Sequence, residues 1–189
     1  MTISEVVAAL GAPSKLGTRS DGGVPLYWCY GKLEIQFDTD APYRANWFQI
    51  EWAGDLEGDF EIFTSNLVLA LGGLTGRATP LGFLSADIWH PSDVAVYFVE
   101  IAGDITVNLL VGKVQLVFRV DQTFLSDKDP KIYLAKNAIA DIVRGIDSHC
   151  ELDSIYSYSS ELEAETSSRR ARRQISGTSY KSALLHPES

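Results

Sequence analysis

The sequence is poor in the residues that build metal sites and disulfide frameworks. Its 189 residues include two cysteines, three histidines and one methionine. The histidines, His90, His149 and His186, do not stand at the spacing of metal ligands. Cys29 and Cys150 could form one disulfide, although the composition favours a reduced, intracellular pair. We therefore predict neither a metal site nor a cofactor.

The short motifs of common catalytic sites are also missing. Gly-x-Ser-x-Gly, His-Glu-x-x-His and calcium-loop patterns do not occur. The glycine-rich run 72–77 follows a predicted helix, whereas a phosphate-binding loop precedes one. His149 and Cys150 are adjacent, and neighbouring residues rarely face each other as a nucleophile and its base must. These absences predict a protein that is not an enzyme.

Long apolar runs are absent as well. No stretch approaches the roughly 18 apolar residues that would cross a membrane, and residues 1–5 lack the features of a signal peptide. The net charge of −9 argues against nucleic acid as a partner and favours a basic one. A basic run at 169–173 follows three glutamates and is interpreted as part of a solvated tail. We expect a cytoplasmic protein that binds neither membranes nor nucleic acid.

The clearest positive signal is the alternation of apolar and polar residues in 33–38 and 47–52, which predicts two half-buried strands. Further strands are predicted at 27–30, 94–101, 105–111 and 114–120. Helices are predicted at 3–10, after a capping box formed by Thr2 and Glu5, at 60–71, and from Pro130 to about residue 146. The fold class is therefore α+β, an antiparallel meander with helices packed on one face.

The length fits a single α+β domain over residues 1–150. The Ser, Glu and Arg content of 151–189 predicts a flexible, partly disordered tail. Residues 4–11 resemble 65–72, and residues 31–37 resemble 112–118. These matches suggest two helix-plus-hairpin units, 1–58 and 59–150. The alternative is coincidence between two common patterns.

Residues 4–13 and 28–37 together form a short helix, Leu-Gly-x-Pro, and then Tyr-Gly-x-Leu-Glu-x-x-Phe. This module resembles small bacterial immunity-type proteins of polymorphic toxin systems. More distantly, it is similar to the repeats of β-lactamase inhibitor proteins and to outer-membrane assembly lipoproteins, although the lipobox cysteine of the latter is lacking. The resemblance covers about the first 52 residues. It implies that the protein binds other proteins, and it carries over no residue of established function.

The predicted partner-binding site is the polar face of the sheet. If Leu33, Ile35 and Phe37, together with Phe48, Ile50 and Trp52, face the core, acidic and amide side chains line the opposite face. An aromatic anchor in a polar surround is typical of binding hot spots, and carboxylates would steer a basic partner. The predicted partner-binding residues are Glu34, Gln36, Asp38, Tyr43, Trp47, Gln49 and Glu51. The hypothesis is an immunity protein that neutralises a basic toxin by occluding its active surface.

Two other interpretations stay open. The loop containing Asp87, Trp89 and His90 could form a small-molecule or catalytic site, which requires a concave apolar pocket. A deep pocket beneath residues 80–93 would favour this alternative, whereas an open acidic sheet face would favour protein binding. The predicted last helix could instead mediate self-association.

Overall fold

The computed structural model describes residues 1–18, 25–56, 60–70, 75–168 and 171–186. A nine-stranded antiparallel sheet organises them, with strand order β1-β2-β3-β4-β10-β9-β8-β7-β11. The strands are β1 (Lys15–Thr18), β2 (Pro25–Tyr30), β3 (Leu33–Phe37), β4 (Ala45–Glu51), β7 (Ala95–Ile101), β8 (Asp104–Val111), β9 (Val114–Val120), β10 (Cys150–Ser157) and β11 (Arg173–Ser176). The predicted α+β class and antiparallel meander are confirmed.

The remaining elements are helices and one separate hairpin. The helices are α1 (Ile3–Leu10), α2 (Pro80–Leu84), α3 (Gln122–Leu125), α4 (Pro130–Lys136), α5 (Ile139–Ile146), α6 (Glu161–Ser168) and α7 (Gly177–Leu185). The hairpin pairs β5 (Phe60–Thr64) with β6 (Leu67–Ala70). Among the described residues, no helix is both long enough and apolar enough to cross a membrane.

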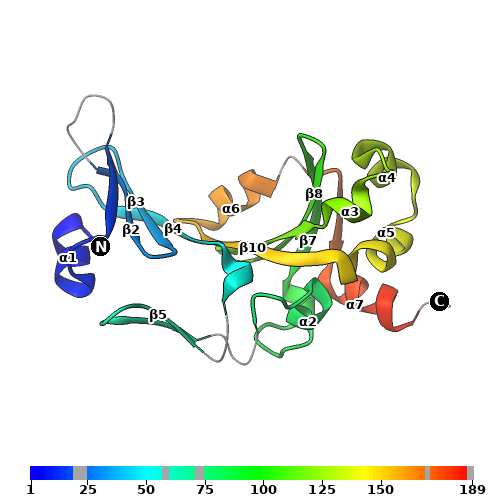
Figure 1. Cartoon of the computed structure of the whole chain (residues 1–189), viewed down its shortest axis with the longest axis horizontal. Helices are drawn as coiled ribbons and strands as arrows, with labels where there is room; N and C mark the ends of the chain where they lie inside the picture. The colour runs from blue at the N-terminus through cyan, green and yellow to red at the C-terminus, as the bar shows by residue number, and fades with distance from the viewer. Residues whose placement is uncertain (19–24, 57–59, 71–74, 169–170, 187–189) are drawn as a thin grey trace.

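The strand register gives the sheet an apolar and a polar face. Ile35 lies opposite Phe48, and Ile50 lies between Leu33 and Ile155 on the apolar face. This face continues through Leu116, Leu109 and Val96, and most of the hydrophobic core lies against it. In Figure 1, α2 and α7 lie on one side of β10 and α6 lies on the other.

The polar face is partly covered. It runs from Glu34 and Gln49 across Tyr156 to Gln115. Between β10 and α6, the hydroxyl of Tyr158 donates to Gln115 Oε1 at 2.6 Å, and Ala164 of α6 is fully buried. The segment around α6 therefore covers the polar face at β9 and β8, while the part formed by β2, β3, β4 and β10 stays more accessible.

The sheet is built from two meanders with the same strand order. The N-terminal meander comprises α1 and β1–β4, and the C-terminal meander comprises α2 and β7–β10. Their last strands, β4 and β10, pair at the centre of the sheet through residues 48–51 and 154–157. Gly31 and Gly112, at φ 62° and 53°, form the turns before the third strand of each meander. The similarity of 31–37 to 112–118 thus falls on equivalent strands.

The helix predicted at 60–71 is wrong, because most of this segment forms the β5–β6 hairpin. The polar residues Thr64, Ser65 and Asn66 interrupt the apolar run, and the backbone amide of Asn66 donates to Thr64 Oγ1 at 3.1 Å. The proposed match of 65–72 to the first helix is wrong for the described part of that segment; residues 71–72 lie outside it. The helix before the second meander is α2 instead.

The single helix predicted from Pro130 is divided into α4 and α5. Asn137 ends α4 with an extended backbone at ψ 151°, and its side-chain amide donates to the Tyr133 carbonyl at 2.9 Å. Ala138 is then the N-cap residue of α5. Of the apolar residues in the predicted helix, Ile142, Val143 and Ile146 are buried, whereas Ile132 is 50% exposed.

The predicted tail at 151–189 is wrong for most of its length. β10 lies between β4 and β9, and β11 extends the sheet beside β7. The described end of the basic run contacts the rest of the protein: Arg172 pairs with Glu100, and Arg173 Nη2 donates to the Asn137 carbonyl at 3.1 Å. Residues 169–170 and 187–189 lie outside the described residues. The polar composition of 151–189 wrongly suggested disorder, because its many polar residues alternate with a few apolar side chains that are buried.

The C-terminal helix is held by a buried hydrogen bond. Tyr180 of α7 is fully buried, and its hydroxyl donates to Asp147 Oδ1 at 2.9 Å. The same oxygen accepts a hydrogen bond from the Leu81 amide at the start of α2, also at 2.9 Å. Burial and the nearby Asp147 raise the pKa of Tyr180 above its usual value, so this hydroxyl stays protonated.

Candidate functional site

Five of the seven predicted partner-binding residues lie together on the polar face. Glu34 is opposite Gln49, and Gln36 is opposite Trp47. Gln49 is buried, and its Nε2 donates to Glu51 Oε1, whereas Glu51 itself is exposed. The alternation of β3 and β4 was therefore sufficient to identify residues that share one surface.

Asp38 and Tyr43 lie elsewhere, in the turn that joins β3 to β4. The Asp38 amide donates to the Arg44 carbonyl at 2.8 Å, and the Tyr43 amide donates to the Asp40 carbonyl at 2.9 Å. Tyr43 has a φ of 53° and is half-buried. This turn is at the end of β3 remote from Glu34, so the structure does not bring these two residues to the same part of the surface.

Trp47 is only half-exposed. Its ring meets that of Tyr156 edge-on, with centroids 6.0 Å apart, and Tyr156 in turn stacks on Tyr158 at 6.4 Å. Part of the predicted aromatic anchor is therefore used within the protein. Only the part of the Trp47 ring that remains exposed is available to a partner.

A more accessible aromatic residue is Trp52, which was predicted to face the core. That prediction is wrong: β4 ends at Glu51, and Trp52 has a φ of 56° and is 71% exposed. The left-handed conformation turns the chain into the short helix Ala53–Asp55, so the side chain leaves the alternation of the strand. The following Ala-Gly-Asp is the sequence signal that the strand had ended.

Carboxylates surround this tryptophan. Trp52, Asp55, Glu151 and Asp153 line a shallow depression of about 220 Å³. Arg119 also borders it and pairs with Asp153 at 2.8 Å. Glu51 precedes Trp52 and lies opposite Ser154 of β10, and Glu34 is on the next strand. We call this set the acidic–aromatic surface: Glu34, Glu51, Trp52, Asp55, Glu151 and Asp153.

Negative charge on this surface is unfavourable unless a cation lies close to it. Burial raises the pKa of the Glu34 carboxyl, and the charge of Glu51 raises it further, while a hydrogen bond from Gln36 and the charge of Lys15 act in the opposite direction. Cys29 lies between Lys15 and Glu34 in the register, and burial followed by the charge of Glu34 raises its thiol pKa. A cation brought to the surface by a partner would relieve this cost.

The alternative site around His90 is not assembled as predicted. His90 caps the short helix Pro91–Asp93, with Nδ1 2.7 Å from Ser92 Oγ. Trp89 packs on Phe83, with ring centroids 5.2 Å apart. A cavity of about 300 Å³ does lie beneath residues 80–93, and Phe83, Ile88 and Trp89 line it. Neither Asp87 nor His90 is part of its lining.

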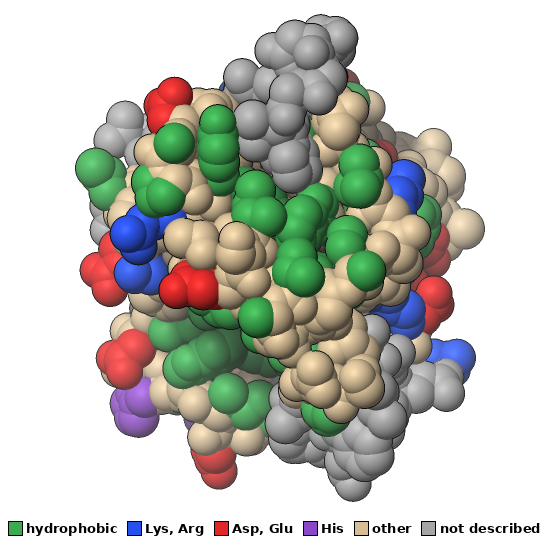
Figure 2. All heavy atoms as spheres, turned by 90° about the vertical axis from the view of Figure 1, so that its left-hand side faces the viewer, with side chains coloured by type: hydrophobic (Ala, Val, Ile, Leu, Met, Phe, Trp, Pro, Cys, Tyr) green, Lys and Arg blue, Asp and Glu red, His purple; other side chains and the backbone are tan. Residues whose placement is uncertain are grey.

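A groove beside α1 was not predicted from the sequence. It is an open groove of about 660 Å³ between α1, the apolar face of β3 and β4, the β6 strand and the end of β10. Figure 2 shows hydrophobic side chains gathered across the middle of this end of the molecule, which is hollowed between them. Phe48 is on the groove and is 45% exposed. No sequence signal could have shown that the apolar face is left partly uncovered here.

In the described part of the chain, no group of three or more histidine, cysteine, aspartate or glutamate side chains is placed to hold a metal ion. Cys29 and Cys150 are both free thiols, and burial raises the pKa of each. Comparison of the chain with family models, with curated proteins and with solved structures gave no match.

Proposed function

We propose that this protein is a protein-binding module, and that it neutralises a basic toxin by occluding the toxin's active surface with the acidic–aromatic surface. The observation that carries the proposal is Trp52, which is 71% exposed and shares its depression with three carboxylates. Large exposed aromatics within a polar surround are typical of binding hot spots. The resemblance of residues 4–13 and 28–37 to immunity-type proteins supports the same role.

The two kinds of side chain would act at different stages of binding. The carboxylates of Glu51, Asp55 and Glu151 would attract a basic partner and raise its association rate. Trp52 would then be covered by the partner, and loss of its contact area would mainly raise the dissociation rate. Neutralising Glu34 and Glu51 with lysine or arginine side chains of the partner would remove their mutual repulsion.

The test screens the products of the genes that neighbour this one for a toxin, with binding measured by surface plasmon resonance and protection measured by survival of cells that express the toxin. We expect Trp52→Ala to weaken binding by about 30-fold or more, the range for a hot spot. Glu51→Lys should lower the association rate, and the difference from the native protein should shrink in high salt.

Two substitutions outside the surface serve as matched controls. Ile101→Ala removes another exposed apolar side chain, and Glu161→Lys reverses another exposed charge. Both should leave affinity and protection unchanged. Equal binding by native protein and by folded Trp52→Ala and Glu51→Lys variants would contradict the proposed surface, and failure of the native protein to protect would contradict the toxin role.

A further inference from the structure

The 660 Å³ groove has a continuous apolar floor and two joined walls. Leu33, Ile35 and Ile50 of the sheet form the floor, α1 forms one wall, and β6 forms the other. The walls are connected where Asn66 Nδ2 donates to the Ala9 carbonyl at 2.9 Å. This hydrogen bond therefore holds the two walls of the groove together at one end.

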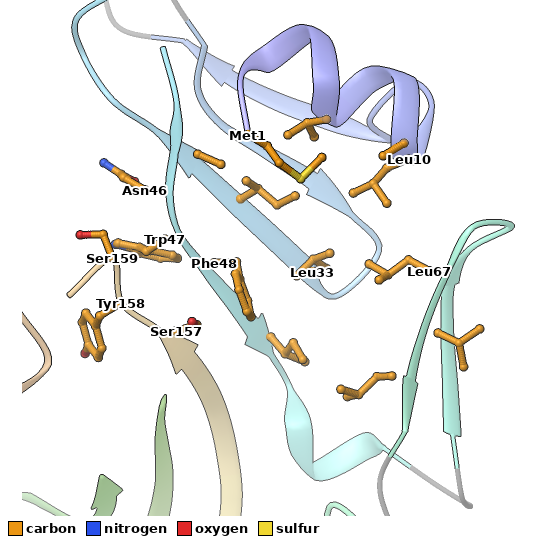
Figure 3. Close-up of a pocket in the computed structure, with 17 residues that line it drawn as sticks. Met1, Leu10, Leu33, Asn46, Trp47, Phe48, Leu67, Ser157, Tyr158 and Ser159 are labelled. Atoms are coloured by element: carbon orange, nitrogen blue, oxygen red, sulfur yellow. The ribbon is translucent and has the colours of Figure 1, made fainter. Parts of the chain in front are cut away.

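The groove is apolar except on one side. None of the side chains that line it carries a charge. The polar lining residues are Asn46, Ser157, Tyr158 and Ser159. Figure 3 shows these four on one side of Phe48, with Leu10, Leu33 and Leu67 on the other side. Such a distribution suits a ligand with an uncharged polar end and a long apolar body.

The apolar path extends beyond the groove. The 300 Å³ cavity beneath residues 80–93 shares Phe48, Ile50 and Leu69 with it. From there the lining continues along Leu116 and Phe118 of β9. A chain-like ligand could thus lie along the sheet with its end between the two meanders.

The shape of the groove favours a hydrocarbon chain over a peptide. β3 and β4 are paired on both edges, so an extended peptide on this floor would find no backbone partners. A helix about 10 Å wide that rises 1.5 Å per residue occupies roughly 120 Å³ per residue. The groove volume of about 660 Å³ would hold only one and a half turns of it. A single hydrocarbon chain needs neither the width nor the hydrogen bonds.

We propose that the groove binds a neutral single-chain amphiphile, with its hydrocarbon chain on Leu33, Phe48 and Ile50 and its hydroxyl-type head beside Asn46 and Ser157. Asn46 Oδ1 is buried and has no hydrogen-bond partner among the described residues. The ligand would cover the exposed parts of Phe48 and of Val68, which is 54% exposed. This binding does not depend on the acidic–aromatic surface.

The test is titration of the full chain with hexan-1-ol and octan-1-ol below their solubility limits, followed by NMR shifts or calorimetry. Binding should saturate at one ligand per chain. Each added methylene should tighten it about fourfold, so octanol should bind roughly 15-fold tighter than hexanol. Octylammonium, with the same chain but a positively charged head, should bind at least tenfold more weakly than octanol because no lining side chain carries a carboxylate to pair with it.

Two neighbouring alanines of α1 provide a matched pair of variants. Both are exposed, but Ala9 lines the groove and Ala8 does not. Ala9→Trp should fill the groove and reduce octanol binding at least tenfold, whereas Ala8→Trp should not change it. Urea unfolding of both variants checks that the fold is kept.

Ser157→Ala tests the position of the head group. It should weaken the binding of octan-1-ol and leave the binding of octane, which has no head group, unchanged. Absence of saturable binding by the native protein would overturn the proposal. So would equal binding by a folded Ala9→Trp variant, or equal affinity for the charged and uncharged probes.

Discussion

The two meanders share a strand order but differ in what covers their apolar face. In the C-terminal meander, Phe98, Leu109 and Phe118 are fully buried, and α5 and α7 lie against each other on this part of the molecule. In the N-terminal meander, the corresponding face is bordered by α1 and β6, and Phe48 stays 45% exposed. Figure 1 shows α1 and β5 at one end and α4, α5 and α7 at the other.

The difference arises in the connections rather than in the strands. β3 and β4 are joined by the short turn 38–44, whereas 121–149, between β9 and β10, supply α3, α4 and α5. The C-terminal meander also receives β11 and α7 from the end of the chain. The same sheet plan therefore gives a closed core on one side and an accessible groove on the other.

The largest expected effect comes from truncating matched phenylalanines in the two meanders. Phe118→Ala, in the closed core, should lower the free energy of unfolding by about 3–5 kcal/mol. Phe48→Ala, at the groove, should cost only about 1 kcal/mol because its side chain is already half in water. Urea unfolding followed by tryptophan fluorescence measures the stability of both variants. Equal losses of stability would contradict the difference in burial between the two meanders.

The next largest effect concerns the attachment of α7 to the C-terminal meander. Tyr180→Phe removes the hydroxyl that donates to buried Asp147 and should destabilise the fold by about 1–3 kcal/mol. Ser182→Ala on the exposed side of the same helix should change stability by less than about 0.5 kcal/mol. If Tyr180→Phe were equally neutral in thermal unfolding, α7 would not be anchored as described.

The turns before the third strands should respond alike. Gly31→Ala and Gly112→Ala each place a Cβ on a residue with positive φ, at a cost of about 1 kcal/mol. The added Cβ meets nothing within 4 Å at Gly31, and at Gly112 only Glu161 Oε1 at 3.9 Å. Closely similar shifts in the urea midpoint would show that the two meanders require glycine equally at this turn. The difference between them would then lie in what covers their apolar face.

The smallest effect concerns Glu34 on the polar face. Because its pKa is raised above the ordinary 4.5, the folded state binds the proton more tightly than the unfolded state. Stability therefore falls as pH rises from 4.5 through the folded-state pKa, and the full penalty is present above it. Glu34→Gln should remove the penalty and stabilise the protein by less than about 1 kcal/mol at pH 7, since the site is largely solvated.

Below pH 4.5 the advantage of Glu34→Gln should vanish, because the native carboxyl is then protonated in both states. Glu151→Gln, an exposed charge on the same surface, provides the comparison for the loss of a negative charge alone. Thermal unfolding between pH 4 and pH 8 measures the dependence. A Glu34→Gln advantage that grows as the pH falls would contradict the direction of the shift.

Short sequence patterns were sufficient to predict a capped helix and the faces of two strands. The capping box of Thr2 and Glu5 starts α1, with the Thr2 amide 2.7 Å from Glu5 Oε2. Alternation placed Glu34, Gln49 and Glu51 on one face, since period two depends only on the strand itself. The part of the acidic–aromatic surface contributed by β3 and β4 was predictable for this reason.

The features that depend on distant parts of the chain could not be read from the sequence. β10 looks like a polar linker until its partners β4 and β9 are known. Glu151 and Asp153 join Trp52 only through that pairing. Residues 60–70 carry an apolar spacing that fits a helix or a hairpin, and tertiary packing decided between them.

The central pairing of β4 with β10 has a consequence for how the protein is made. The ribosome releases β4 before the entire C-terminal meander, so one edge of β4 lacks its partner until β10 has been synthesised. Contacts between segments so far apart in the chain form slowly, and an unpaired strand edge invites association with other chains. Nascent or truncated forms that end before residue 150 should accordingly be the aggregation-prone species of this protein.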